Sequence, residues 1–205
     1  MKVNVARAQF EAKQVDMKAQ RLRMITYAIA LGCSACRNKW NFGKRRLDRL
    51  VRGAYEEITN WYEHYGGNPP EEGMLPDNVP TLYYGMRNQV KALDIPAEEI
   101  EGKYVLSREF SVWKNRKMCE KRSYRWEEAE SLRMITRAYW YAMLLYLWHT
   151  YENGGASLSE IYEKIQREWF STMDAYLDCD DRRDGYVNKR IDVAVQAIEK
   201  LGVKL

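Results

Sequence analysis

The most unusual charges in the sequence lie at the start of a predicted helix. Three consecutive cations follow Gly43 directly, and two further arginines follow in the same helix. A helix carries partial positive charge at its N-terminus, so cations there are unfavourable and anions are preferred. Free backbone N–H groups beside cationic side chains suit a phosphate or a carboxylate. The predicted anion- or partner-binding residues are Trp40, Phe42, Lys44, Arg45, Arg46, Arg49 and Arg52.

A second basic stretch lies between Lys103 and Arg125, where aromatic residues are interleaved with cations. Cations neutralise phosphates and aromatic rings stack on bases, so this composition is typical of nucleic-acid contacts. Both basic stretches have an alternative interpretation as the solvated face of a helix, which is the commoner role of such residues. The candidate nucleic-acid contacts are Trp113, Lys114, Arg116, Lys117, Lys121, Arg122 and Arg125.

Motifs for metal binding and catalysis are weak or missing. Cys33 and Cys36 form a C-x-x-C among small residues of a predicted helix, where packing is favoured over zinc or redox chemistry. The Asp-rich segment 178–184 does not fit a calcium loop, because counting from Gly185 places Ile191 where glutamate is needed. The chain holds two histidines and no serine-hydrolase, phosphate-loop or zinc-protease motif. We therefore predict no catalytic residues, no metal and no cofactor.

The elements that carry these residues are all predicted to be helices. Glycine and proline divide the hydrophobic pattern into helices over about 5–40, 44–65, 81–93, 107–152, 157–177 and 188–201. Ser107 is expected to cap the fourth helix, and Ser157 with Glu160 forms a capping box for the fifth. The segment 138–148 is apolar on all sides and is expected to be the most buried. The predicted fold class is an all-α helical bundle.

A five-residue match indicates an internal repeat. Residues 22–26 read LRMIT, and residues 132–136 repeat these letters. Each half has the order long helix, medium helix, short helix. Residues at the ends of the short helices also correspond, namely Val90, Leu93 and Ile95 with Ile198, Leu201 and Val203. We predict a degenerate tandem duplication, with repeats at 1–95 and 108–205, a connector at 96–107, and the long helices packed together in one domain.

Composition favours a cytoplasmic protein without membrane contact. The chain has 205 residues, 46% hydrophobic and 30% charged, with a net charge of +4, which is enough apolar material for a core. Its longest apolar run, 138–148, is about half of the roughly 20 residues that span a bilayer. Four cysteines are too few for a disulfide framework, which favours a reducing compartment. Long amphipathic helices are also compatible with a homodimer.

The segment 40–49 resembles a turn found in small helical proteins of phages and prophages of Firmicutes. The shared pattern is FGKRRL at residues 42–47, and GYV at residues 185–187 is similar to a second step in that group. The tandem duplication, and the absence of this turn from the second half, depart from the single-unit pattern of the group. The resemblance implies an accessory phage protein, and some such proteins are stoichiometric inhibitors of bacterial immune systems.

These observations lead to three functional hypotheses. The first is a non-catalytic inhibitor, encoded by a phage, that occupies a host defence protein or its nucleic-acid complex through the basic helix start. The second is a nucleic-acid-binding helical module that uses both basic stretches. The third is a sponge for a phosphate-bearing signal nucleotide. Salt-dependent binding of generic nucleic acid would indicate the second, and release of a small phosphate compound on denaturation would indicate the third.

Overall fold

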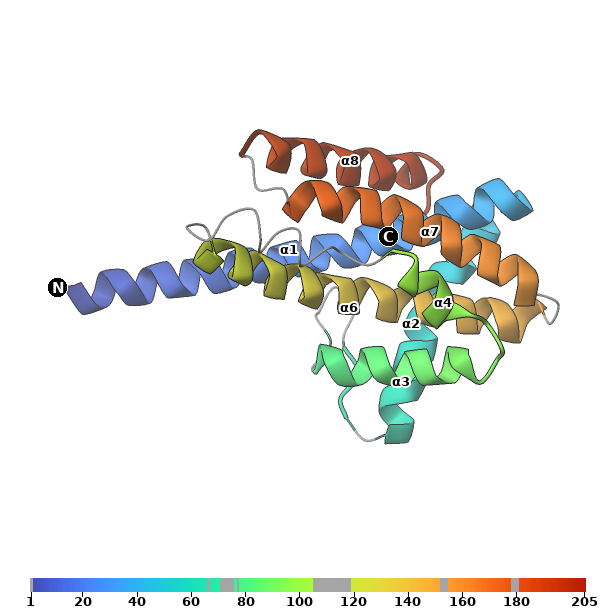
Figure 1. Ribbon diagram of the computed structural model, residues 1–205. Helices are drawn as coiled ribbons and strands as arrows, with labels where there is room; N and C mark the ends of the chain where they lie inside the picture. The colour runs from blue at the N-terminus through green and yellow to red at the C-terminus, as the bar shows by residue number, and fades with distance from the viewer. Residues whose placement is uncertain are drawn as a thin grey trace.

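The computed structural model describes the backbone of residues 2–65, 67–70, 76, 78–104, 119–151, 155–177 and 181–205. Within these segments the side chains of 2–6, 8–17, 119–129, 155–156, 173–177 and 181–186 lie outside the description. Every regular element of the described backbone is a helix, so the predicted all-α class is confirmed (Figure 1). The helices are α1 (Lys2–Trp40), α2 (Lys44–Tyr65), α3 (Val79–Lys91), α4 (Ala97–Gly102), α6 (Cys119–Tyr151), α7 (Gly155–Leu177) and α8 (Asp181–Glu199).

Helix α6 forms the centre of the bundle and contacts α1, α2, α3 and α7. Figure 1 shows α3 on one side of α1 and α6, with α7 and α8 on the other. The segment 138–148 was predicted to be the most buried: residues 138–145 and Leu147 of α6 are buried, whereas Tyr146 and Trp148 are only partly buried. Trp140 is fully buried, and its indole N–H donates to the carbonyl oxygen of Ala28 at 2.8 Å. This bond joins the two long helices inside the core.

Each long helix packs extensively against the shorter helices of the other half. Helix α6 makes its most extensive contacts with α2 and α3, and α1 contacts α7 and α8 more extensively than it contacts α2. The two halves therefore interlock, and separating them would expose apolar faces that are now buried. None of the helices in the described part of the chain has an apolar stretch long enough to span a bilayer.

Helices α3 and α8 end in the same way. Each is followed by a turn closed by backbone hydrogen bonds and by a residue with positive φ, which is Asp94 at 56° after α3 and Gly202 at 77° after α8. The next residues, Ile95 and Val203, are both buried. Residue 94 therefore corresponds to residue 202 in structure as well as in sequence. The duplication that would explain this correspondence stays a prediction.

Helices α2 and α7 also share one burial pattern. When Lys44, the first residue of α2, is aligned with Gly155, the first residue of α7, six buried positions coincide, whereas Gly53 and Gln166 are each buried in one helix only. The positions buried in both helices are Leu47, Leu50, Val51, Ala54, Ile58 and Trp61 in α2, and Leu158, Ile161, Tyr162, Ile165, Trp169 and Thr172 in α7. This alignment defines the register between the two helices that is used below.

Several predicted boundaries are wrong. Helix α3 begins at Val79, earlier than predicted, because the Asn78 side chain accepts the Thr81 N–H at 3.4 Å and Pro80 is tolerated in a first turn. The capping box is also wrong: α7 begins at Gly155, which places Ser157 inside its first turn. Helix α8 starts at residue 181, ahead of the predicted 188. Ser107, the predicted cap of the fourth helix, lies outside the described residues.

The segment after α3, predicted as part of a connector, instead contains a short helix, α4. Ala97, Ile100 and Glu101 of α4 are buried, and the helix packs on α7. Its brevity and three glutamates hide it from a search for helical periodicity, since a helix of this length shows less than two turns of any pattern. Tertiary packing therefore stabilises α4, because isolated helices this short are unstable in water.

Candidate functional site

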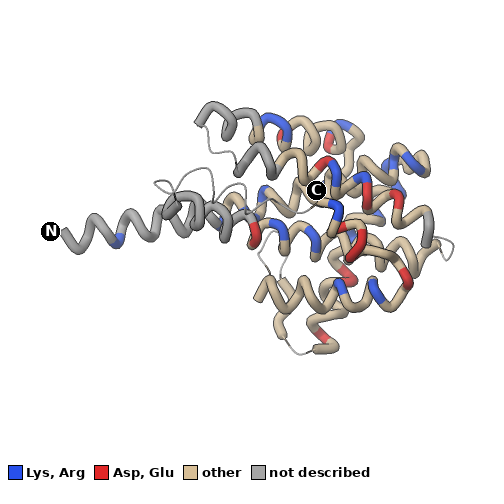
Figure 2. Tube along the Cα trace, in the orientation of Figure 1, with Lys and Arg blue, Asp and Glu red and all other residues tan. Residues whose placement is uncertain are grey.

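The predicted basic site lies at the start of α2. The Gly43 carbonyl oxygen accepts the N–H groups of Arg46 at 3.0 Å and Leu47 at 3.1 Å, which closes the first turn of the helix. All four arginines of this run are exposed. Lys44 is also exposed, and its ammonium group pairs with Asp48 at 2.6 Å. Figure 2 shows cations gathered where α1 ends and α2 begins.

Arg45, Arg49 and Arg52 form one stripe along α2, at spacings of four and three residues. Among the residues that the structure describes, no carboxylate lies within ion-pairing distance of any of the three. Like charges at these spacings destabilise a helix by roughly 0.2–0.5 kcal/mol per pair. We call these three residues the arginine stripe.

Several cations elsewhere in the bundle pair with carboxylates from neighbouring helices. Arg23 of α1 pairs with Asp192 of α8, and Lys39 of α1 pairs with Glu160 of α7. The same kind of pairing joins α3 to α4 and α8 to α7. The arginine stripe therefore differs from these cations in having its charge directed to solvent.

The two aromatic residues of the predicted site support the turn from inside. Phe42 is only 3% exposed, and its ring centroid lies 5.5 Å from those of both Trp40 and Tyr151. The Arg46 guanidinium lies over the Phe42 ring, 5.5 Å from its centroid, in a cation–π arrangement. Phe42 is therefore a core residue that positions Arg46, and its ring is not accessible to a partner.

The second basic stretch lies outside the described part of the chain. Residues 105–118 are not described, and the side chains of α6 before Glu130 are not described either. The structure therefore does not test the nucleic-acid contacts predicted there, which remain a prediction. The residues concerned are Trp113, Lys114, Arg116, Lys117, Lys121, Arg122 and Arg125.

Cys33 and Cys36 are buried within α1 and carry free thiols. Burial raises the pKa of the Cys33 thiol to about 12 and also raises the pKa of Cys36. Both thiols are therefore protonated at neutral pH and pack as small apolar groups. Within the described residues, no group of three or more potential ligand side chains is placed to hold a metal ion.

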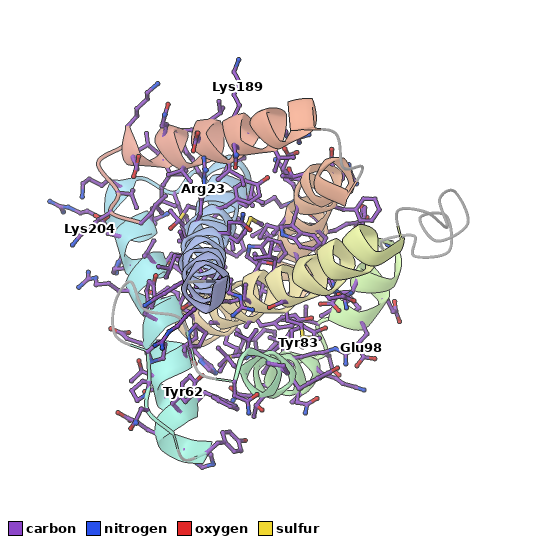
Figure 3. All side chains as sticks on the ribbon, turned by 90° about the vertical axis from the view of Figure 1, so that its left-hand side faces the viewer. Arg23, Tyr62, Tyr83, Glu98, Lys189 and Lys204 are labelled. Atoms are coloured by element: carbon purple, nitrogen blue, oxygen red, sulfur yellow. The ribbon has the colours of Figure 1, made fainter. Side chains whose placement is uncertain are left out.

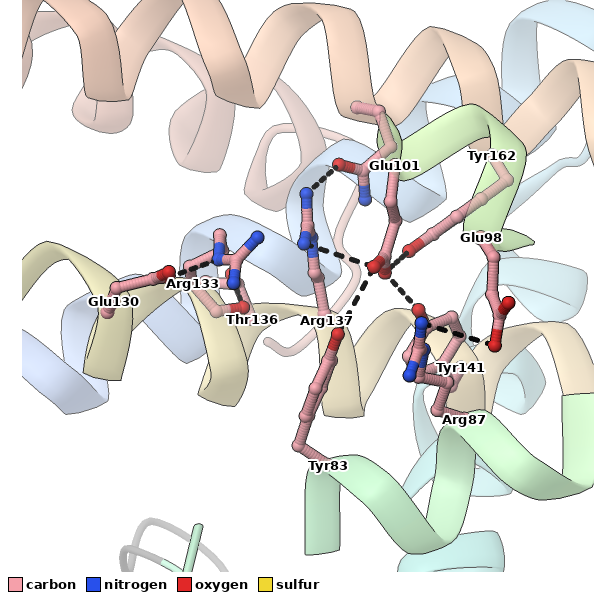
Figure 4. Close-up of polar contacts among 11 residues, drawn as sticks. Tyr83, Arg87, Glu98, Glu101, Glu130, Arg133, Thr136, Arg137, Tyr141 and Tyr162 are labelled. Carbon is pink, nitrogen blue, oxygen red and sulfur yellow. Dashed lines mark hydrogen bonds and ion pairs between the residues drawn. The ribbon is translucent and has the colours of Figure 1, made fainter. Parts of the chain in front are cut away.

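A buried polar network, which the sequence does not reveal, joins α4 to α3, α6 and α7 (Figure 4). The Glu101 carboxylate accepts hydrogen bonds from Tyr162 at 2.7 Å, from Tyr83 at 3.1 Å, and from Tyr141. Its Oε2 atom also lies 3.1 Å from Nη1 of Arg137, which is fully buried. The members come from four helices, so no local motif could have predicted their meeting.

The charges of this network are stabilised by one another. The Arg137 guanidinium donates to Gln166 at 3.0 Å and lies 5.7 Å from the Trp169 ring centroid. Burial lowers the pKa of Arg137, but Tyr162 and Glu101 raise it by more, so the guanidinium stays charged. Burial raises the pKa of Tyr162 well above its usual value, so its phenol remains a neutral donor. The network therefore fastens α4 to the bundle and is not open to solvent.

Residues just after α4 extend this attachment along α7. The Lys103 ammonium lies 3.7 Å from Glu163. Tyr104 accepts a hydrogen bond from Nε of Arg167 at 3.4 Å, and its ring centroid lies 5.9 Å from that of Phe170. We call the contact of residues 97–104 with α7 the α4–α7 seam.

Two hollows are present on the described surface of α2. The first, of about 680 Å³, runs beside the arginine stripe and is lined by Lys44, Asp48, Val51, Arg52, Tyr55, Glu56, Ile58, Thr59, Asn60, Pro70, Gly202, Lys204 and Leu205. We call it the α2 groove. The second, of about 580 Å³, lies between α2 and α3 beside the exposed rings of Tyr65 and Tyr84 and is lined by uncharged residues. Only the α2 groove includes a member of the arginine stripe, Arg52.

The arginine stripe and the α2 groove are open to solvent, whereas the buried network is closed to it. The chain was compared with protein-family models, curated proteins and solved structures, and it matches none of them.

Proposed function

We propose that this chain is a non-catalytic binding protein that occupies an acidic partner through the exposed arginines of α2. The observation that carries the proposal is the arginine stripe, whose cations lack carboxylates among the described residues. Charges that repel one another lower the stability of the free protein and become favourable when an anionic surface covers them. The partner class that this arrangement fits is a protein surface rich in Asp and Glu.

The resemblance of residues 40–49 to phage proteins gives this proposal a biological setting. We propose a phage-encoded counter-defence role in the host cytoplasm, in which the partner is a host defence protein that is inhibited by being occupied. The narrow, well-defined basic stripe fits stoichiometric binding better than it fits a broad nucleic-acid surface, which needs many cations along its length.

The test is affinity capture from a lysate of a Firmicutes bacterium, with mass spectrometry of the protein and small-molecule fractions. The variant Arg45→Glu with Arg49→Glu should lose the captured protein, with affinity reduced about tenfold or more, because two attractions become repulsions. A matched control, Lys189→Glu in α8 with Lys200→Glu just after it, makes the same charge change away from the stripe and should retain the captured protein.

Other results would redirect the proposal. Capture of generic nucleic acid, with affinity falling steeply as salt rises, would establish the nucleic-acid module instead. Release of a small phosphate compound on denaturation would establish the nucleotide sponge. Equal capture by the double-glutamate variant and the control would show that the arginine stripe is a solvated face.

A further inference from the structure

The α2 groove lies at the place that corresponds to the α4–α7 seam. In the register defined by the shared buried positions, five residues of the groove wall correspond to five residues of α7. On α7, these positions contact α4 and the residues after it or belong to the buried network. The corresponding sets are Val51, Arg52, Tyr55, Glu56 and Thr59 on α2, and Tyr162, Glu163, Gln166, Arg167 and Phe170 on α7.

The end of the sequence supports the same correspondence. Since Gly202 corresponds to Asp94, Leu205 corresponds to Ala97, the first residue of α4. Gly202 and Leu205 line one end of the groove, so the groove begins where α4 begins in the other half. Figure 3 shows Lys204 on the α2 side of the molecule and Glu98 of α4 on the opposite side.

The wall of the α2 groove has a different chemistry from the wall of the seam. Val51 stands at the position of Tyr162, so the phenol that binds the Glu101 carboxylate is missing. Val51 and Ile58, which are both buried, form the apolar floor of the groove. A carboxylate placed at this floor would lose its hydration without gaining hydrogen bonds, so the floor favours an apolar anchor.

The charges at the rim of the groove are reversed relative to the seam. Arg52 stands at the position of Glu163, which pairs with Lys103. Glu56 stands at the position of Arg167. A helix bound in the groove along the path that α4 takes on α7 would place its counterpart of Lys103 beside Arg52. That position of the bound helix therefore needs a carboxylate.

From these differences we propose that the α2 groove binds a short amphipathic helix of a partner protein. At the position equivalent to Glu101 this helix has an apolar residue. At the position equivalent to Lys103 it has a carboxylate. The proposal rests on the proposed function, since it names the segment of an acidic partner that docks beside the arginine stripe. The chain's own α4 has the wrong residues at both positions, which disfavours a second copy as the occupant.

The test uses two fluorescent peptides based on residues 96–104, each held helical by a lactam bridge between the positions of Glu98 and Gly102. The matched peptide replaces Glu101 by leucine and Lys103 by glutamate, and the reference peptide keeps both native residues. Fluorescence anisotropy with the full chain should show saturable binding of the matched peptide, about tenfold tighter than the reference. Equal binding of the two peptides, or no binding of the matched one, would overturn the proposal.

Reversing the charge of Arg52 tests whether the matched peptide binds in the α2 groove. The variant Arg52→Glu should bind the matched peptide with an affinity roughly threefold to tenfold lower than wild type does. A peptide with leucine at position 101 and the native lysine at position 103 should bind this variant without that loss of affinity. Lys189→Glu makes the same change on α8, far from the groove, and should leave both affinities unchanged. If the matched peptide binds the Arg52→Glu variant as tightly as it binds wild type, its binding site lies outside the groove and the proposal is overturned.

The outcomes separate this inference from the function it rests on. If a captured partner depends on Arg45 and Arg49 but neither peptide binds, the groove inference fails and the proposed function stands. If the matched peptide binds in the groove and no acidic partner is captured, the proposed function fails alone. A concentration-dependent dimer that the matched peptide disrupts would show that a second copy is the occupant, which would overturn the inference.

Discussion

When α2 and α7 are aligned by their shared buried positions, the α4–α7 seam and the α2 groove fall at matching positions of the two helices, but the seam is closed and the groove is open. In the seam, Tyr162 donates a hydrogen bond to buried Glu101, and Glu163 lies near a lysine. In the groove, Val51 and Arg52 stand at these two positions. Six positions are buried in both supporting helices. The comparison shows that helices with similar buried faces can carry a closed or an open surface, and that the residues at the matching rim positions differ.

The α4–α7 seam and the α2 groove also differ in the buried residues beneath them. The seam depends on a buried ion pair between Glu101 and Arg137, which is stable only while both charges have partners. The floor of the groove is apolar, with Val51 and Ile58 both buried. We therefore expect the seam to contribute to folding, and the groove to contribute to binding alone.

The largest expected effect comes from breaking the seam. Glu101→Ala should lower the free energy of unfolding by about 3–5 kcal/mol, because it leaves the buried Arg137 charge without a carboxylate. Urea unfolding followed by circular dichroism measures this change. Glu98→Ala is the control on the same helix, since its ion pairs are exposed and should contribute less than about 1 kcal/mol. Equal effects of the two substitutions would show that the network does not hold α4.

A smaller effect should follow from making the seam more like the groove. Tyr162→Phe keeps the ring but removes the hydrogen bond to Glu101, and it should cost about 1.5–3 kcal/mol because the acceptor is charged. Tyr139→Phe provides the contrast: among the described atoms, the buried Tyr139 hydroxyl has no hydrogen-bond partner. Its removal should leave the free energy of unfolding unchanged or slightly raised. The same unfolding assay measures both variants, and a loss at Tyr139 as large as at Tyr162 would contradict this account.

The buried tyrosines should also make stability depend on alkaline pH. Burial raises the pKa of Tyr139, Tyr141 and Tyr162, so their phenols stay protonated to a higher pH in the folded protein than in the unfolded chain. The contribution of these tyrosines to stability is therefore fully present below their unfolded pKa of about 10 and falls as the pH rises above it, by up to about 1.4 kcal/mol per pH unit for each tyrosine. Urea unfolding from about pH 8 to about pH 11 tests this, and Tyr139→Phe should give a shallower decline than wild type.

The smallest expected effect concerns the side of the molecule with the groove. Arg45→Glu with Arg49→Glu should raise the free energy of unfolding by about 0.5–1 kcal/mol, because a carboxylate at position 45 is favoured at the start of α2 and one at position 49 attracts Arg52. The two carboxylates repel each other as the two arginines did, so that pair contributes no change. Differential scanning calorimetry at low salt would detect the increase. Added salt should reduce it. A decrease in stability would mean that these arginines have a structural role, which would weaken the proposed function.

Much of the local structure was predictable from the sequence, because local patterns determine it. The bounds of α2 agree with the prediction, since its apolar spacing is regular and Gly43 and the glycines after Tyr65 limit it. The burial of the α6 segment 138–145 also followed from its composition. The arginine stripe was visible as a run of cations, but whether carboxylates neutralise those cations could not be read from their order.

What the sequence by itself determined is therefore the helical class, the main helices and the position of the basic run. Only the tertiary structure decided that Glu101 meets Arg137, that Phe42 is buried beneath Arg46, and that α4 closes one surface while its equivalent stays open. The physical reason is that helix formation depends on residues three or four apart, whereas ion pairing and burial depend on which distant helices pack together. The interlocking of the two halves brings those distant residues into contact.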